Sequence, residues 1–200
     1  MTSSMRFIHD RKIKELFESH VFHVRPQTVL NIGCGKKEHK RYKEIFSGMT
    51  YLTQDVTGFD DYTPDYIFDI TRQHIKDKKF DLILCLFVLE HINEPKKAID
   101  NMHKMLKKDG IIIFSVPFVQ NIHTDYDYFR YTEQGVVYLF RRFDEIYIEP
   151  FGNPIISFFK YLCNKKIGIL TNIFSRELSY LFGKTDRRMP TGYFGYARKG

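Results

Sequence analysis

The feature that most constrains the fold is a series of short apolar runs that alternate with polar, helix-like stretches from residue 28 onward. The runs are apolar at successive positions, which is typical of strands buried on both faces of a parallel sheet. A helix with one buried stripe is expected over Glu94–Lys107, between Pro95 and the Asp109-Gly110 pair. This alternation predicts a doubly wound α/β fold. The expected strands are Thr28–Ile32, Thr50–Thr53, Tyr66–Phe68, Phe80–Leu86 and Gly110–Val116.

The pattern changes after Val116. Residues 117–132 crowd polar, aromatic and ionisable side chains into a predicted loop, and Thr132 has the character of an N-cap for a helix that runs to Arg142. A strand is expected at Asp144–Glu149. Two helix-periodic apolar segments follow within 155–182, and a final strand is expected at Gly192–Arg198.

Composition and charge narrow the class of protein. Hydrophobic residues make up 43% of the 200 residues, which excludes disorder and collagen-like repetition. The three cysteines form no C-x-x-C pair, so neither a disulfide framework nor a zinc knuckle is expected. The charged N-terminus and the lack of an uncharged apolar run of about 20 residues indicate a soluble, cytoplasmic protein.

The net charge of +7 is concentrated late in the chain. Residues 151–190 carry seven basic and two acidic side chains. A solvated helical face explains such a block, and an anionic partner is the alternative. Because the same stretch has strong apolar periodicity, a nucleic acid partner is not favoured.

A glycine turn follows the first predicted strand. Gly33-Cys34-Gly35 stands at its carboxyl end, where ligands approach open α/β sheets, and glycine permits close backbone contact. A plain strand–helix turn is the alternative. Asp55, about twenty residues on, could accept hydrogen bonds from a ribose. Asp69, beside Ile70 at the end of the third strand, could bracket an adenine.

These motifs together resemble a known family. The series VLNIGCG, TQDV, IFDI, FDLILCLFVLEHI and MLKKDGIIIFSVPF, from Val29 to Phe118, resembles the class I S-adenosylmethionine-dependent methyltransferases, in particular their type 11 branch. The resemblance implies a Rossmann-like, mostly parallel seven-stranded sheet with an antiparallel last strand and a helical insertion before it. We expect one domain over 1–200, with an N-terminal helix in 1–25, the core in 26–150, the insertion in 151–190 and the last strand in 191–200.

The resemblance assigns residues to S-adenosylmethionine, the implied cofactor. Asn31 and the glycine turn 33–35 would contact its methionine part, and Asp55 would contact its ribose. Asp69 and Ile70 would contact its adenine, and Leu86 and Phe87 would lie near the sulfonium. Two positions depart from the family pattern, because Asn31 replaces an acidic residue and Lys37 a third glycine. Asn31 can still accept a hydrogen bond from the cofactor's ammonium group, though without charge attraction, and Lys37 indicates a loop that stands further from the cofactor. The nine residues are Asn31, Gly33, Cys34, Gly35, Asp55, Asp69, Ile70, Leu86 and Phe87.

Catalytic and acceptor-binding candidates lie mainly in the loop after the fifth strand. A hydroxyl or ammonium acceptor must lose a proton, and histidine titrates near neutral pH. We expect His123 to be this base with Asp125 orienting it, whereas His91 is a second candidate or a residue that structures its loop. Tyr128 and Arg130 could bind a sugar or an anionic acceptor; alternatively Arg130 pairs with Asp127 or Glu133 and pins the loop. No metal-ligand spacing is present, and no metal site is expected.

The expected reaction is methyl transfer to a small-molecule acceptor. The segment 123–132 is similar to one found in members encoded with polysaccharide or lipid-linked sugar genes, which implies a sugar hydroxyl in surface-glycan biosynthesis. A quinone-type lipid or RNA acceptor, and a catalytically inactive binding protein, are alternatives. NAD binding is disfavoured because the third glycine is missing. The apolar and basic segment 155–182 could cover the active site, pack in a homodimer, or lie on the inner face of the membrane.

Overall fold

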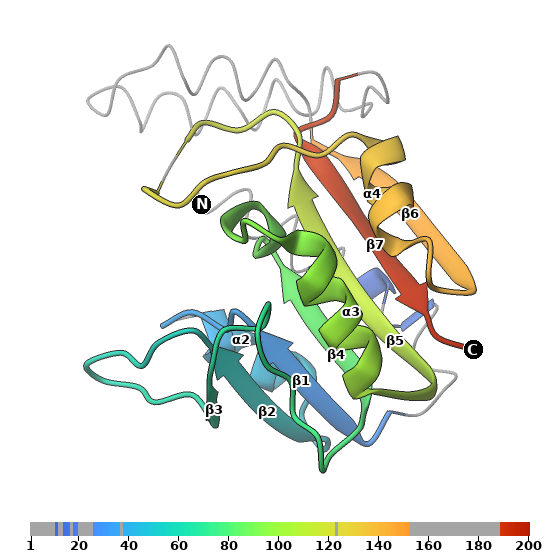
Figure 1. The fold of residues 1–200 in the computed structure, drawn as a ribbon. Coiled ribbons are helices and arrows are strands. Elements are labelled where there is room, and N and C mark those ends of the chain that lie inside the picture. Colours follow the sequence, from blue (N-terminus) through green and yellow to red (C-terminus); the bar gives the residue numbers. More distant parts are fainter. Residues whose placement is uncertain are drawn as a thin grey trace.

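The computed structural model describes residues 11, 14–16, 18–19, 26–36, 38–122, 124–152 and 189–200. Most of the predicted N-terminal helix, Lys37, His123 and nearly all of the predicted insertion therefore lie outside the described residues. The rest forms one sheet with helices on both faces (Figure 1).

The described residues form a seven-stranded sheet with the order β3-β2-β1-β4-β5-β7-β6. Neighbours from β3 to β5 pair in parallel, whereas β7 runs antiparallel to both β5 and β6. The predicted fold, including the antiparallel last strand, is confirmed. The strands are β1 (Thr28–Ile32), β2 (Thr50–Asp55), β3 (Tyr66–Ile67), β4 (Phe80–Leu86), β5 (Leu106–Pro117), β6 (Glu145–Phe151) and β7 (Gly192–Arg198).

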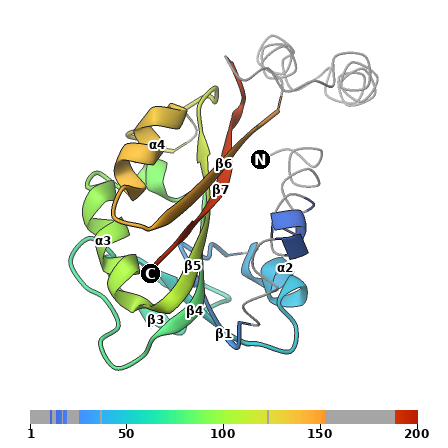
Figure 2. The ribbon, with the colours of Figure 1, turned by 90° about the vertical axis from the view of Figure 1, so that its right-hand side faces the viewer.

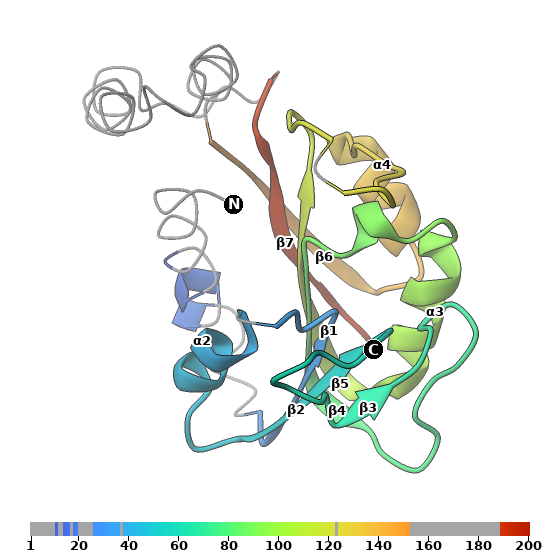
Figure 3. The same cartoon turned by 90° about the vertical axis from the view of Figure 1, so that its left-hand side faces the viewer.

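Helices cover the two faces unequally. α2 (Glu38–Ile45) lies on one face, and α3 (Pro95–Met105) and α4 (Glu133–Phe140) lie on the other (Figures 2 and 3). The predicted N-cap is present, because the Thr132 hydroxyl accepts a hydrogen bond from the Gly135 amide at 3.1 Å. A short 3-10 turn, η3 (Leu89–His91), connects β4 to α3.

Successive residues of the central strands enter two different cores. In β4, Ile83 and Cys85 belong to the cluster under α3 and α4, whereas Leu82 and Leu84 belong to the cluster on the α2 face. All four side chains are fully buried. This explains why the strands are apolar at every position rather than at every second one.

The start of β5 differs from the sequence-based expectation. We predicted a helix over Glu94–Lys107 that Asp109-Gly110 stops, but α3 ends at Met105 and β5 begins at the next residue. Asp109 has a left-handed φ of 59°, and the pairing of β5 with β4 shifts register between Phe80 and Leu82. Asp109-Gly110 therefore forms a kink inside β5, since turn residues also accommodate irregularities of a strand.

Candidate functional site

A cavity of about 220 Å³ is lined by residues at the carboxyl ends of β1 and β4, which pair in parallel and end at the same edge of the sheet. Six of the nine residues predicted to contact a cofactor line it, and Asp55, Asp69 and Ile70 do not. Tyr42 of α2 also lines it and was not predicted. No motif marks Tyr42; its one signal is its place on the helix after the glycine turn. The lining residues are Asn31, Gly33, Cys34, Gly35, Tyr42, Leu86 and Phe87.

The glycine turn closes one side of this cavity. Gly33 and Gly35 have φ values of 61° and 63°, in the left-handed region that favours glycine. A Cβ atom at Gly33 would lie 2.5 Å from Cγ2 of Val88, so a larger residue would clash as well as strain the backbone. The turn therefore requires glycine at position 33.

Asp55 lies beside the turn at the end of β2. Its Oδ2 accepts a 3.0 Å hydrogen bond from the Gly35 amide, and its Oδ1 accepts one from the Val56 amide at 2.8 Å. Burial, together with the Asp55 charge, raises the pKa of Cys34 to about 12. The thiol is therefore neutral at physiological pH, and Cys34 lines the cavity as a small uncharged group.

Asn31 stands on β1 at the base of the cavity and is 2% exposed. Its Nδ2 donates a 2.8 Å hydrogen bond to Oη of Tyr51. Since the amide nitrogen is engaged in this way, Oδ1 is the atom with which Asn31 can accept a hydrogen bond. Burial raises the pKa of Tyr51, which keeps its hydroxyl protonated.

Asp69 and Ile70 are engaged with the protein instead of the cavity. Oδ1 of Asp69 accepts hydrogen bonds from the amide and the hydroxyl of Thr71, at 2.8 and 2.7 Å. Ile70 is buried in the cluster under α3, and its carbonyl accepts a 2.8 Å hydrogen bond from Nδ2 of Asn101. The structure does not bring this pair to the cavity lining, and their contact with adenine stays a prediction.

Phe87 has an unusual backbone at the cavity wall. Its φ of 54° lies in the left-handed region, which costs a non-glycine residue about 1–3 kcal/mol. Its amide donates to the Ser115 carbonyl at 3.0 Å, and its ring meets Phe151 and Phe194 edge-on, with centroids 6.0 and 6.4 Å away. These contacts hold the strained conformation and fix the ring.

Comparison with known families identifies the family of this chain. A family model described as a methyltransferase domain matches residues 5–144, more than half of the chain. The chain is a member of this methyltransferase family. The predicted family is therefore confirmed, and with it S-adenosylmethionine as the cofactor that the family uses.

Curated relatives match parts of this methyltransferase domain. A ubiquinone biosynthesis O-methyltransferase of Actinobacillus pleuropneumoniae serotype 7 is 27% identical, over 44% of this chain and 44% of that protein. The enzyme of the same name from Glaesserella parasuis serovar 5 is 43% identical, over 24% of this chain and 21% of that protein. The chain thus spans less than half the length of these relatives.

Solved structures share the fold over nearly the whole chain. A SAM dependent methyltransferase from Archaeoglobus fulgidus has a TM-score of 0.61 at 14% identity, covering 95% of this chain and 94% of that one. The Burkholderia thailandensis 1,6-didemethyltoxoflavin-N1-methyltransferase, solved with bound 1,6-didemethyltoxoflavin and S-adenosylhomocysteine, has a TM-score of 0.58 at 16% identity, covering 95% of this chain and 77% of that one. These likenesses support the methyltransferase fold.

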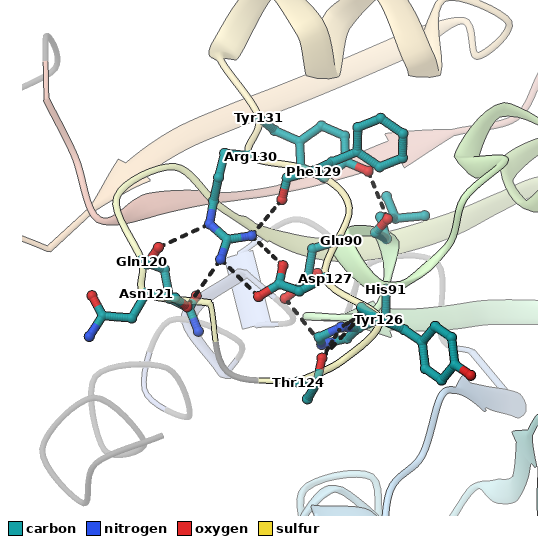
Figure 4. A network of polar contacts seen from close by, with 11 residues as sticks. Glu90, His91, Gln120, Asn121, Thr124, Tyr126, Asp127, Phe129, Arg130 and Tyr131 are labelled. Carbon is teal, nitrogen blue, oxygen red and sulfur yellow. Dashed lines mark hydrogen bonds and ion pairs between the residues drawn. The ribbon is translucent and has the colours of Figure 1, made fainter.

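The loop after β5 of the methyltransferase domain is bound to the η3 turn (Figure 4). The Tyr128 amide donates to the Glu90 carbonyl and the Tyr131 hydroxyl to the Leu89 carbonyl, both at 2.7 Å. Nδ1 of His91 lies 2.7 Å from the Tyr126 carbonyl oxygen, where it acts as donor. His91 thus structures the loop, as one of our two interpretations had it. Its catalytic role stays a prediction.

Arg130 holds this loop from within. Its Nε donates to the Gln120 carbonyl at 3.1 Å, and its two terminal nitrogens donate to the carbonyls of Asn121 and Phe129 and to both carboxylate oxygens of Asp127. Arg130 therefore makes the pairing with Asp127 that the sequence offered as the alternative to acceptor binding. Tyr128, by contrast, is 49% exposed, and Asp125 is exposed. His123 lies outside the described residues.

The described residues contain neither a metal-binding cluster nor a membrane-spanning helix. Within the ranges that the structure describes, no cluster of three or more His, Cys, Asp and Glu side chains could hold a metal ion. In the same part of the chain, no helix has the length and apolar character needed to cross a bilayer. The predicted membrane contact through 155–182 falls on residues outside the description.

Proposed function

We propose that this domain transfers a methyl group from S-adenosylmethionine to a hydroxyl of a small-molecule acceptor. The observation that carries the proposal is the cavity, which gathers residues from β1, the glycine turn and the end of β4 that were assigned to the cofactor from sequence. Ligands of open α/β sheets bind at this edge.

The residues present fit the cofactor. Gly33 and Gly35 line the cavity with backbone that carries no side chain, which suits a ligand lying against the main chain. Oδ1 of Asn31 would accept a hydrogen bond from the ammonium group. Asp55, held by the Gly35 amide, would accept hydrogen bonds from the ribose hydroxyls, because a carboxylate oxygen can accept more than one.

The chain's contribution to methyl transfer is positioning. The bound cofactor supplies an electrophilic methyl group on a sulfonium. Leu86 and Phe87 form an apolar wall at the cavity, and Phe87 is held there by its two ring contacts. Alignment of two reactants can supply several kcal/mol of the barrier, typically about 7–11 kcal/mol in the best-oriented cases. A fixed, apolar wall also keeps water from competing with the acceptor.

Proton removal from the acceptor is assigned to the loop after β5. His91 is engaged in holding the loop, because its Nδ1 donates to the Tyr126 carbonyl at 2.7 Å. We therefore propose His123 as the general base, with the carboxylate of Asp125 orienting it.

The acceptor is proposed as a hydroxyl compound of one of two classes. The likeness of 123–132 to sugar-cluster members supports a sugar or lipid-linked sugar. The names of the curated relatives support a quinone-type lipid precursor. Both classes are small molecules, as is the substrate in the solved toxoflavin methyltransferase. Cytoplasmic localisation, a homodimer and contact with the inner face of the membrane remain parts of this proposal.

Cofactor binding and transfer are tested separately. We expect calorimetry to detect binding of S-adenosylhomocysteine to the purified chain, and no heat at millimolar ligand would favour the inactive binding protein. Labelled S-adenosylmethionine is then incubated with prenylated catechols and with nucleotide sugars. Label transfer to one set identifies the class, and transfer to neither, despite cofactor binding, contradicts a hydroxyl acceptor of these kinds.

A further inference from the structure

Glu90 is a buried acid in the η3 turn, three residues after Phe87 of the cavity wall, with Val88 and Leu89 between them. Its side chain is 0% exposed. Neither Oε1 nor Oε2 has a hydrogen-bond partner among the residues that the structure describes. An ionised carboxylate in such surroundings loses its hydration without compensation, which costs several kcal/mol.

The groups around Glu90 do not offset a negative charge. Arg130 is the nearest cation of the loop, but its guanidinium is bound to both oxygens of Asp127, whose side chain is itself 0% exposed. Glu90 therefore faces an ion pair and not an unmatched positive charge. The titratable and charged groups that face it, from its own turn, the loop and β4, are His91, Asp127, Arg130, Tyr131 and Cys85.

The uncharged form is consequently the stable one in this packing. Burial raises the pKa of Glu90 to about 8 from an ordinary value of 4.5; to smaller extents its own backbone amide and Arg130 lower the pKa, and Asp127 raises it. At neutral pH the side chain is mainly a carboxylic acid. Such a group can donate one hydrogen bond, and Nε2 of His91, 3.9 Å from Oε1, lies too far away to accept it in this arrangement.

The same turn is what the loop is bound to. Tyr128 and Tyr131 bond the carbonyls of Glu90 and Leu89, and Tyr126 bonds His91 (Figure 4). The loop, together with the turn, thus keeps the Glu90 side chain from water. If the loop moved off, water could hydrate that side chain, so the charged and uncharged forms of Glu90 favour different positions of the loop.

We propose that Glu90 is a positioning residue, which as an uncharged carboxylic acid keeps the segment 124–131 docked on the turn beside the cofactor cavity and which on ionisation favours its release. The consequence for methyl transfer rests on the proposed function, because this segment carries Asp125 and the acceptor-binding candidate Tyr128.

The direction of the pH dependence follows from the two pKa values. The docked state binds the Glu90 proton more tightly than the released state, in which the group would titrate near its ordinary 4.5. Docking is therefore strongest below that value, weakens as the pH rises toward about 8, and changes no further above it. Within this window one proton is lost on release, so the docking equilibrium falls by up to about tenfold for each pH unit.

Hydrogen exchange of the loop amides tests this directly. The Tyr128 and Tyr131 amides donate to the carbonyls of Glu90 and Pro117, and their protection factors, corrected for intrinsic exchange, report the docking equilibrium. We expect protection in the wild type to fall between about pH 5 and about pH 8, and a Glu90→Gln variant to keep high protection across this range. The matched control is Glu44→Gln, because Glu44 is an exposed residue of α2, and its loop protection is expected to follow that of the wild type.

Three results would overturn the proposal. Wild-type protection that rises with pH would indicate that Glu90 is held as an ion pair. If protection in Glu90→Gln falls with pH as in the wild type, the effect belongs to His91 or another group. Low protection in Glu90→Gln at every pH would indicate that the charge of Glu90 is needed. Glu90→Met, which also cannot ionise, gives the same test should the amide variant not fold. Because exchange needs no cofactor, S-adenosylhomocysteine calorimetry on the same samples distinguishes a failure here from a failure of the proposed function.

Discussion

The backbone amide of Gly35 donates a 3.0 Å hydrogen bond to Oδ2 of Asp55, and this contact joins the glycine turn after β1 to the end of β2. The two positions are about twenty residues apart in the chain, and parallel pairing of β1 with β2 brings them to one edge. The carboxylate is thus oriented before any ligand binds. Preorganised groups bind with less entropic cost.

Replacing Asp55 with alanine is expected to weaken S-adenosylhomocysteine binding about 10- to 100-fold, since hydrogen bonds to a charged group contribute about 1.5–3 kcal/mol. Calorimetry measures the affinity. Asp60→Ala, in the exposed loop that follows, removes a carboxylate of the same kind and should bind as the wild type does. Equal affinity in the Asp55→Ala variant would remove Asp55 from the ribose site.

Gly33→Ala is expected to destabilise the domain and to abolish cofactor binding. The added Cβ would strain a φ of 61° and meet Val88 at 2.5 Å. Gly48→Ala separates the two effects, because Gly48 has a φ of 89° and no atom within 4 Å of an added Cβ. Urea unfolding should show a loss of about 1–2 kcal/mol from the backbone in Gly48→Ala, and a clearly larger loss in Gly33→Ala. Equal losses would show that Val88 yields without cost.

The sequence alone was enough for the sheet and for most of the cavity. Strands buried on both faces leave uninterrupted apolar runs, so β1, β4 and β7 were predicted with their observed ends. The glycines and the carboxylate at the strand ends could be assigned to the cavity from their residue types alone. Tyr42 was missed because α2 is almost wholly polar, and its burial arises only when the helix packs on the sheet.

Residues of the loop after β5 were beyond sequence reasoning for a different reason. Arg130 could bind an anion or pin the loop, and the choice depends on where the carbonyls of Gln120 and Asn121 lie in space. The burial of Glu90 likewise depends on the loop folding back over its turn. Neither property has a local signature, because both arise from tertiary contacts.

Asp81 joins the starts of β1 and β4, and its substitution tests the frame of the site. Its Oδ2 accepts hydrogen bonds from the amide and hydroxyl of Thr28, at 2.9 and 2.7 Å, and both oxygens lie 2.9 Å from Nζ of Lys107. Burial alone would raise the pKa of Asp81, but the contacts with Lys107 and Thr28 outweigh it and lower the pKa below its usual 3.8.

The lowered pKa of Asp81 determines how its contribution to the free energy of unfolding changes with pH. The charged form is favoured in the folded state, so its stabilisation is present above about pH 4 and is lost as the pH falls through the folded pKa. Asp81→Asn should therefore lower the free energy of unfolding by about 1–3 kcal/mol at neutral pH. The difference should shrink below pH 3.8. Urea titrations at several pH values measure it, and a difference that is constant with pH would assign the loss to packing alone.

Arg130→Lys is expected to loosen the loop without changing cofactor affinity. The guanidinium donates to three backbone carbonyls and to both oxygens of buried Asp127, a set that a single ammonium cannot reproduce. Each hydrogen bond that the ammonium cannot make removes about 1.5–3 kcal/mol of stabilisation from the loop. Chymotrypsin should then cleave at Tyr126 or Tyr128 much faster than in the wild type. Arg141→Lys is the control, because Arg141 is exposed and makes one hydrogen bond, to the Tyr138 carbonyl. Unchanged cleavage in Arg130→Lys would mean that the contacts of the turn with Tyr128 and Tyr131 suffice to hold the loop.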